Sequence, residues 1–241
     1  MIKIVRINPL LEILRASPFR VQKIFIQKGT SKIRVREMRE RAEELNIPLR
    51  FADKAKLDRM HPYHQGVVGH VADKGYVSLE SILSASSTPF LVLLDEVMDP
   101  QNLGAIIRTA EGAGVDGLIL PERRSAGLTE AVWTVSAGAK EHMKMSRVKN
   151  LARCMDDLRD RGLWLVGSEG KASEFWYEFD YTLPVGLVMG SEEKGLRPGV
   201  QKKCDKLLSI PMLGQVASLN VGAAASIFIY EVVRQRKSGK K

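Results

Sequence analysis

Three polar segments of the chain each follow an apolar run, and their residue types suit ligand binding. In a parallel sheet covered by helices, ligands bind where strands end and helices begin. Amide, hydroxyl, carboxylate and guanidinium groups at such places can bind and orient a ligand by hydrogen bonds and charge. The segments are DPQNLGAIIR with Asn102 and Arg108, SEEKGL with a turn bounded by Gly190 and Gly195, and LGQVASLNVGAAAS with Ser218 and Asn220.

Each segment by itself also has an ordinary structural explanation. Asn102 and Ser218 are typical helix N-cap residues. Arg108 could pair with Glu111, three residues later on the same helix. The small residues 222–225 could simply allow two helices to pack closely. The hypothesis of a ligand site therefore depends on the three segments occurring together.

Other kinds of site are disfavoured by position or spacing. Residues 112–117, GAGVDG, match a dinucleotide-binding pattern, but they close a helix and open a strand, so they are better interpreted as a C-cap and turn. His61 and His64 have ligand-like spacing without a third His or a Cys nearby, which favours a polar loop and no metal. Cys154 and Cys204 form no C-x-x-C pair.

The positive charge of the chain is concentrated near its N-terminus. Residues 1–75 contain 16 Lys and Arg against 8 Asp and Glu, whereas residues 76–241 contain 21 against 20. A compact basic segment joined to a near-neutral one indicates a module that binds a polyanion such as nucleic acid. The alternative is a solubilising surface, because KIRVREMRERAEEL mixes both signs along one helix.

Hydrophobic periodicity divides the chain at the same place. Residues 1–75 alternate helices with the strands KIFIQ, IPLRFA and GVVGHVA, which predicts a small α/β domain. A Ser-rich linker is predicted over 76–88. Over 89–241, the apolar runs FLVLLD, GLIL, LWLVGS, VGLVMG and LLSIPM alternate with helices, which predicts a parallel sheet covered on both faces.

Length and composition agree with a folded protein of one or two domains. The 241 residues can bury a sizeable core, and 44% of them are hydrophobic and 27% charged. No apolar stretch approaches the ~20 residues of a membrane span. The N-terminus lacks the apolar core and cleavage site of a signal peptide. We therefore expect a cytoplasmic protein.

The three segments, in this order, resemble the three motifs of the SpoU/TrmH family of SPOUT methyltransferases. DPQNLGAIIRTA is similar to the first motif, VMGSEEKGL to the second and IPMLGQVASLNVGAAAS to the third. The resemblance is closest to bacterial enzymes that methylate a guanosine ribose 2′-hydroxyl in large-subunit ribosomal RNA. NPLLEILR, KIFIQKG and HQGVVGHV also resemble that group's N-terminal RNA substrate-binding domain, which is similar to small ribosomal proteins.

The resemblance implies a fold, a cofactor and a set of site residues. It implies a trefoil knot in the C-terminal parallel-sheet domain and a homodimer formed through that domain. S-adenosylmethionine would lie in the knot, against Gly190, Ile210 and Leu219, with Met189, Ser191 and Met212 beside them. The implied catalytic residues are Asn102, Arg108, Glu192, Ser218 and Asn220.

Methylation of a ribose hydroxyl needs in-line attack of the 2′ oxygen on the methyl group of a sulfonium, without metal or covalent intermediate. Arg108 could contact the ribose or a phosphate and stabilise charge on the attacking oxygen. Because a guanidinium stays protonated, Arg108 as general base would need help from a phosphate or from Glu192.

One residue departs from the family pattern. The second motif usually reads G-x-E-G-x-G-L, and here Glu193 stands in place of the middle glycine. If that glycine needs a positive φ, Glu193 would be strained or the loop rearranged. Two alternatives to the ribosomal RNA enzyme stay open: a transfer RNA ribose methyltransferase, and an RNA-binding protein on this scaffold without catalytic activity.

Overall fold

The computed structural model describes residues 1–239, which form two compact units. The first unit combines residues 1–75 with residues 128–142. The second combines residues 76–127 with the chain from residue 143 onward. Each unit has its own sheet, and the predicted α/β class is confirmed.

The first unit is built on a mixed four-stranded sheet with the order β1-β4-β2-β3. β2 and β3 are parallel, whereas β4 pairs antiparallel with β1 and β2. The elements of this unit are β1 (Ile2–Ile4), α1 (Ile7–Ala16), η1 (Pro18–Arg20), β2 (Val21–Gln27), α2 (Ile33–Glu44), β3 (Leu49–Ala52), α3 (Lys54–Met60), β4 (Val67–Val71), α6 (Glu130–Val135) and η2 (Ala139–Glu141).

Apolar residues of α2 lie on one side of the helix and face the core of this unit. Val35, Met38 and Ala42 of α2 are buried, and Leu45 packs against the same cluster. α1 lies close over β4, because a Cβ at Gly69 would be 2.5 Å from Leu10 Cδ1. The sequence reading missed β1, because three residues are too few to show an alternation.

Residues 128–142 complete the core of the first unit, although they lie far along the chain. Trp133 is 1% exposed and belongs to the same hydrophobic cluster as α1 and α2. Arg20 Nη1 donates to both carboxylate oxygens of Glu141, at 2.7 and 2.5 Å, and both side chains are buried. Removal of either partner would leave a buried charge, which is strongly destabilising.

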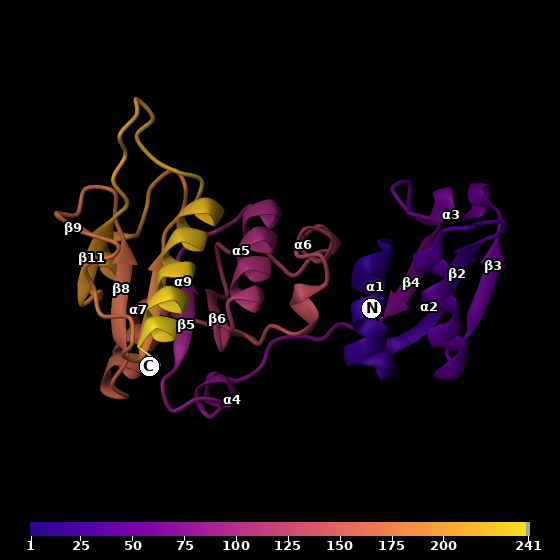
Figure 1. The fold of residues 1–241 in the computed structure, drawn as a ribbon, viewed down its shortest axis with the longest axis horizontal. Coiled ribbons are helices and arrows are strands. Elements are labelled where there is room, and N and C mark those ends of the chain that lie inside the picture. The colour runs from indigo at the N-terminus through magenta and orange to yellow at the C-terminus, as the bar shows by residue number, and fades with distance from the viewer. Residues whose placement is uncertain (240–241) are drawn as a thin grey trace. The chain divides into compact units, whose positions relative to one another are not determined.

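The second unit is built on a parallel seven-stranded sheet with the order β7-β6-β5-β10-β8-β11-β9. α5 and α9 lie side by side on one face of it (Figure 1). The elements are α4 (Leu79–Leu83), β5 (Phe90–Leu94), α5 (Pro100–Gly112), β6 (Gly117–Pro121), β7 (Met145–Val148), α7 (Leu151–Asp160), β8 (Trp164–Ser168), β9 (Glu174–Phe175), β10 (Val185–Met189), α8 (Pro198–Gln201), β11 (Lys206–Ser209) and α9 (Val221–Ser238).

The five strands predicted for this sheet are all present, and the two missed ones, β7 and β9, are its short edge strands. On the face opposite α5 and α9, residues of α4, α7 and α8 form one hydrophobic cluster with the strands. Ile82 of α4 is fully buried, and a Cβ at Gly117 would lie 2.5 Å from Ile82 Cγ2. Residues 76–88 therefore contain a packed helix. The domain boundaries given above, 1–75, 76–88 and 89–241, stay predictions. The trefoil knot also stays a prediction.

Candidate active site

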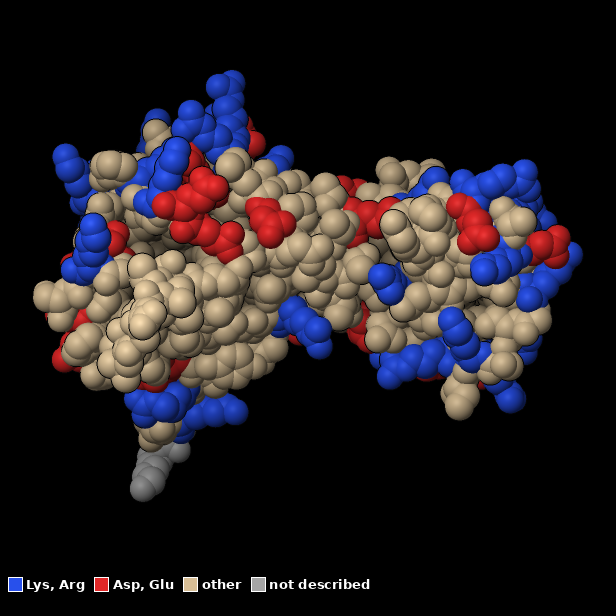
Figure 2. Space-filling model, turned by 90° about the horizontal axis from the view of Figure 1, so that it is seen from above, with Lys and Arg blue, Asp and Glu red and all other residues tan. Residues whose placement is uncertain are grey.

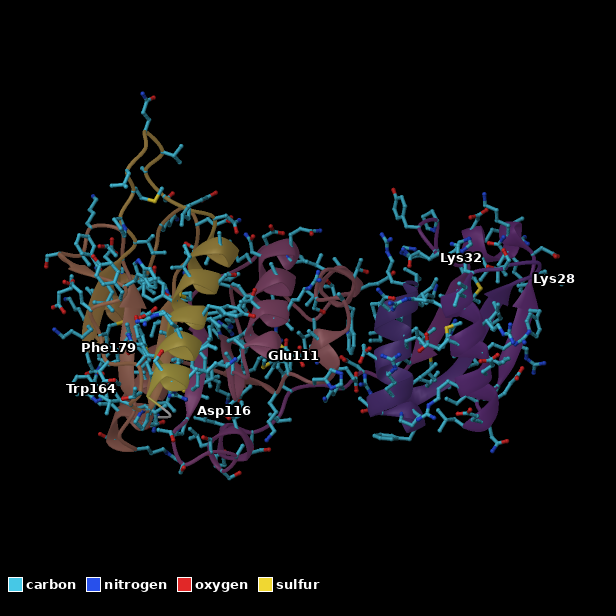
Figure 3. The ribbon with its side chains drawn as sticks, viewed as in Figure 1. Lys28, Lys32, Glu111, Asp116, Trp164 and Phe179 are labelled. Atoms are coloured by element: carbon cyan, nitrogen blue, oxygen red, sulfur yellow. The ribbon has the colours of Figure 1, made fainter. Side chains whose placement is uncertain are left out.

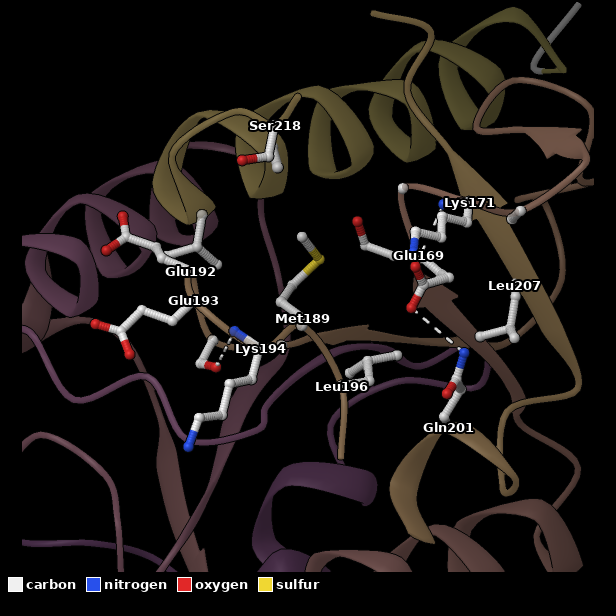
Figure 4. Close-up of a pocket in the computed structure, with 18 of the residues that line it drawn as sticks. Glu169, Lys171, Met189, Glu192, Glu193, Lys194, Leu196, Gln201, Leu207 and Ser218 are labelled. Atoms are coloured by element: carbon white, nitrogen blue, oxygen red, sulfur yellow. Dashed lines mark hydrogen bonds between the residues drawn. The ribbon is translucent and has the colours of Figure 1, made fainter. Parts of the chain in front are cut away.

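A cavity of about 850 Å³ lies where β8 and β10 end and α9 begins. Its size is in the range of small-molecule and cofactor sites. Four of the six predicted cofactor contacts line it: Met189, Gly190, Ser191 and Leu219. Figure 4 shows Met189 in this cavity. Ile210 and Met212, which lie in the segment between β11 and α9, do not line it.

The loop after β10 folds back tightly on Gly190. A Cβ at Gly190 would lie 2.2 Å from the carbonyl carbon of Gly195, so no larger residue fits without movement of the backbone. Ser191 and Gly195 exchange two backbone hydrogen bonds, of 3.0 and 2.9 Å. Gly195 takes the positive φ of this loop, at 64°, and Glu193 is not in the left-handed region. The strain considered for Glu193 does not arise.

Sequence reasoning missed one wall of the cavity, formed by the segment SEGKA at the end of β8. Glu169 Oε2 accepts a hydrogen bond of 3.3 Å from Gln201 Nε2 (Figure 4). Glu169 Oε1 accepts from the backbone N–H of Lys171, also at 3.3 Å. Its place in the sequence could have predicted this wall, because SEGKA follows an apolar run in the same way as the other three segments.

Asn220 brings the three sequence segments together. Its Nδ2 donates to Asn102 Oδ1 at 2.9 Å and also to the Glu192 carboxylate. Its Oδ1 accepts from the backbone N–H groups of Gly222 and Ala223, at 2.9 and 3.3 Å, so Asn220 is the N-cap of α9. One amide therefore caps α9 and connects it to the first turn of α5 and to the loop after β10.

The N-cap alternatives for Asn102 and Ser218 are wrong. Asp99 caps α5 by accepting from the backbone N–H of Gln101 at 3.0 Å, which leaves Asn102 inside the first helical turn and 6% exposed. Because Asn220 caps α9, the exposed Ser218 is free to line the cavity.

A second cavity, of about 240 Å³, adjoins the first. Asn102 and Glu96 line it, and it shares Glu192, Glu193 and Lys194 with the first cavity. Glu192 thus stands at the wall between two spaces. The carboxylate that Asn220 holds therefore borders both cavities.

Arg108 lies apart from these groups. α5 begins at Pro100, so Arg108 is its ninth residue, six positions after Asn102 and ~120° away around the helix axis. Its side chain is exposed, lines neither cavity and forms no hydrogen bond or ion pair with any residue in 1–239. The alternative pairing with Glu111 is not formed.

The small residues 222–225 do allow α5 and α9 to pack closely. A Cβ at Gly222 would lie 3.4 Å from Ala105 Cβ. Thr109 Oγ1 and Ser226 Oγ form a hydrogen bond of 3.1 Å between the two helices. This packing fixes the start of α9, and with it Asn220, against the helix that carries Asn102.

An ion pair between a buried carboxylate and a partly exposed arginine fixes the end of β5. Asp95 is fully buried, and its carboxylate accepts from the backbone N–H and from Nε of Arg197, at 2.9 and 2.8 Å. The hydrogen bond from Arg197 to Asp95 raises the pKa of the arginine further. This pair joins the end of β5, which precedes the first segment, to the residue that follows the second segment, and no sequence pattern indicated it.

The two histidines considered as metal ligands have separate acidic partners. His61 Nε2 lies 3.0 Å from Glu130 and His64 Nε2 lies 3.0 Å from Asp58. Within residues 1–239, no group of three His, Cys, Asp or Glu side chains is placed to hold a metal ion.

Comparison with known families agrees with this fold. Residues 89–230 match the SpoU rRNA Methylase family, and residues 7–77 match the domain described as RNA 2′-O ribose methyltransferase substrate binding. The chain is therefore an RNA methyltransferase by class. It belongs to the SpoU rRNA methylase family, and the resemblance noted from its three motifs is confirmed.

Individual relatives span nearly the whole chain. The 23S rRNA (guanosine-2′-O-)-methyltransferase RlmB of Pseudomonas putida is 40% identical over 240 residues, 98% of this chain and 97% of the relative. The SpoU methyltransferase AviRb of Streptomyces viridochromogenes, crystallised in complex with the cofactor AdoMet, is 27% identical with a TM-score of 0.84, covering 98% of this chain and 91% of AviRb. The A. aeolicus TrmH/SpoU tRNA modifying enzyme is 32% identical with a TM-score of 0.58. The match covers 67% of this chain and 82% of that enzyme.

Proposed function

We propose that this protein transfers a methyl group from S-adenosylmethionine to the ribose 2′-hydroxyl of a guanosine in large-subunit ribosomal RNA. The observation that carries the proposal is the position of Asn220, which holds Asn102 and Glu192 together between two adjoining cavities. Ribosomal RNA is favoured over transfer RNA, because the relative named for 23S rRNA spans 98% of this chain. By comparison, the tRNA modifying enzyme covers only 67% of this chain.

The larger cavity has the features that S-adenosylmethionine requires. Gly190 lets the main chain approach the ligand, and Leu196, Leu207 and Leu219 provide apolar surface for a flat ring. The Glu169 carboxylate at the end of β8 is suited to accept hydrogen bonds from ribose hydroxyls. Bound S-adenosylmethionine supplies a methyl group on a positively charged sulfur.

The residues of this chain orient the acceptor and handle its proton. Asn220 holds one oxygen of Glu192, and the second oxygen accepts no hydrogen bond from residues 1–239. We assign to Glu192 the removal of the 2′-hydroxyl proton, which needs a group within hydrogen-bond reach in the bound complex. The guanidinium of Arg108 stabilises negative charge on the attacking oxygen.

Arg108 performs this role in a homodimer. Its exposed, unpaired guanidinium points away from the face of α5 that carries Asn102. We propose that chains pair through their methyltransferase domains and that Arg108 of one protomer serves the site of its partner. A cytoplasmic protein remains our expectation, and no helix within residues 1–239 is long and apolar enough to cross a membrane.

The decisive experiment maps ribose methylation in RNA from cells with and without the protein. One 2′-O-methylguanosine in 23S rRNA should disappear when the protein is absent. Replacement of that ribose by deoxyribose should abolish transfer in vitro, because the acceptor oxygen is gone. Loss of a mark in tRNA alone would overturn the rRNA assignment. Calorimetry with S-adenosylmethionine tests the alternative of a silent RNA-binding protein, which need not bind the donor.

A further inference from the structure

The first unit contains a cavity of about 410 Å³ that the methyl-transfer site does not use. It lies beside the loop between β2 and α2, and β3 contributes Phe51 to its wall. Its lining includes two arginines and no Asp or Glu. The lining residues that matter here are Gln27, Thr30, Ser31, Arg36, Arg39 and Phe51.

Phe51 has no role in the core of the unit. Its side chain is 54% exposed on the edge strand β3, and the hydrophobic clusters described for the first unit do not include it. An exposed aromatic ring beside cationic side chains is the combination on which proteins stack the bases of single-stranded nucleic acids. The ring therefore offers a stacking surface at the mouth of a cationic cavity.

Arg36 and Arg39 lie three residues apart and so share a face of α2. Each pairs with an exposed glutamate one turn later, at 2.9 Å for Arg36 and 3.7 Å for Arg39. Exposed pairs of this kind are weak and exchange readily. A phosphate, which can accept two parallel hydrogen bonds from a guanidinium, would replace the glutamates as partner.

The surroundings of the cavity are open and basic. Lys28 and Lys32 lie at the same end of the first unit (Figure 3). At Gly29, which has a φ of 72°, an added Cβ would meet no atom within 4 Å. On the visible face of the first unit, Lys and Arg outnumber Asp and Glu (Figure 2). The exposed Glu40, Glu43 and Asp53 are each paired with a basic side chain of this surface, so a polyanion would compete only with weak surface pairs.

We propose that this cavity binds one unstacked nucleotide of the RNA substrate. The base stacks on Phe51, and its phosphate contacts Arg36 and Arg39. The Gln27 amide and the hydroxyls of Thr30 and Ser31 are placed to hydrogen-bond the base edge or the 2′-hydroxyl. The proposal rests on the RNA substrate proposed above and names where an unpaired nucleotide binds.

The test measures affinity of the full-length protein for a short single-stranded oligoribonucleotide of mixed sequence and for the duplex of the same sequence. Phe51→Ala should weaken binding of the single strand about tenfold, the loss of one base–aromatic stack. Binding of the duplex should change little, because paired bases cannot stack on the ring. Phe51→Trp should retain the affinity for the single strand.

Matched controls separate the cavity from general charge and exposure. Phe19 is 86% exposed in the same unit outside the cavity, so Phe19→Ala should leave affinity unchanged. For the single strand, Arg39→Ala should make the negative slope of log affinity against log salt concentration less steep by about 0.7, because one phosphate contact is lost. Arg41→Ala is the control on the same helix, because Arg41 lines a different cavity, together with three glutamates.

Equal affinity of Phe51→Ala and wild type for the single strand would overturn the proposal, as would an equal loss in Phe19→Ala. Either result would leave the proposed methyl transfer intact if the wild type binds RNA and S-adenosylmethionine. If the wild-type protein binds neither, the proposed function itself fails.

Discussion

Asn220 donates a hydrogen bond of 2.9 Å to Asn102, although 118 residues separate them in the sequence. The same amide nitrogen also contacts Glu192, and the amide oxygen caps α9. One side chain thus combines the start of a helix with the assembly of the candidate site. The two roles can be separated by substitution.

Substitution of Asn220 by Asp should preserve the cap and disrupt the bridge. Asp retains an oxygen for the N–H groups of Gly222 and Ala223, whereas its second oxygen would face the acceptor oxygens of Asn102 and Glu192. Asn220→Ser also keeps an oxygen that can cap the helix. Asn220→Ala loses both the cap and the bridge, so its free energy of unfolding should be about 1 kcal/mol lower than that of Asn220→Ser. Urea unfolding and methyl-transfer assays of the three variants check this. Full activity in Asn220→Asp would contradict the role of the bridge.

Substitution of Arg108 by Ala should reduce methyl transfer by about 100-fold and leave donor affinity unchanged. The reason is that Arg108 lines no part of the larger cavity, and its proposed role is to act on the acceptor. Steady-state kinetics and donor calorimetry measure the two quantities. Arg153, exposed on α7, provides the control, and Arg153→Ala should behave as wild type. Near-normal turnover of Arg108→Ala would remove its catalytic assignment.

Mixed dimers should show whether Arg108 acts on the partner's site. We expect Arg108→Ala and Glu192→Gln to be nearly inactive separately. When the two variants are combined in one dimer, one site contains both intact groups, so activity should recover. If both groups acted within the same chain, each site would carry one defect and the mixture would stay inactive. Co-expression with two affinity tags, followed by assay of the purified mixed dimer, provides the measurement.

Substitution of Glu193 by Gly, the residue usual in this family, should not improve the donor loop. Glu193 is outside the left-handed region, so a glycine relieves no strain and should cost about 0.4–1 kcal/mol through the unfolded state. Gly195 has a φ of 64°, so Gly195→Ala should be the more damaging change to stability and donor affinity. Thermal unfolding and donor calorimetry compare the variants. A large gain of donor affinity in Glu193→Gly would show that Glu193 strains the loop.

Lys140 should make the stability of the first unit depend on pH. It is fully buried, its Nζ has no hydrogen-bond partner within residues 1–239, and burial together with nearby Lys74 lowers its pKa from 10.5 to about 8, against the attraction of Asp73 and Glu141. Between these values the unfolded chain binds more protons than the folded chain, so stability should rise with pH from about 8 to 10.5.

Lys140→Met should remove this pH dependence and increase stability at pH values below about 8, by up to ~3 kcal/mol. Urea unfolding from neutral to alkaline pH measures the effect. Lys56 is exposed in the same unit, so Lys56→Met should leave the pH profile as in wild type. An unchanged profile in Lys140→Met would mean that the lysine titrates as it does in the unfolded chain.

The sequence by itself determined the α/β class, the parallel sheet and the three segments that form the site. It could do so because apolar strands have a short, readable periodicity and parallel strands end at one edge of a sheet. Met189, Gly190, Ser191 and Leu219 line the cavity for this reason. The short edge strands carry too few residues for the same pattern.

Only the tertiary structure decided which side chains meet. Asn220 with Asn102, and Arg20 with Glu141, are pairs separated by more than a hundred residues, and no local pattern encodes such a contact. The structure also placed Glu169 in the cavity and turned Arg108 away from it. Local sequence sets which elements form. The partner of each polar side chain depends on how those elements pack, because burial makes an unpaired hydrogen-bonding group or charge costly.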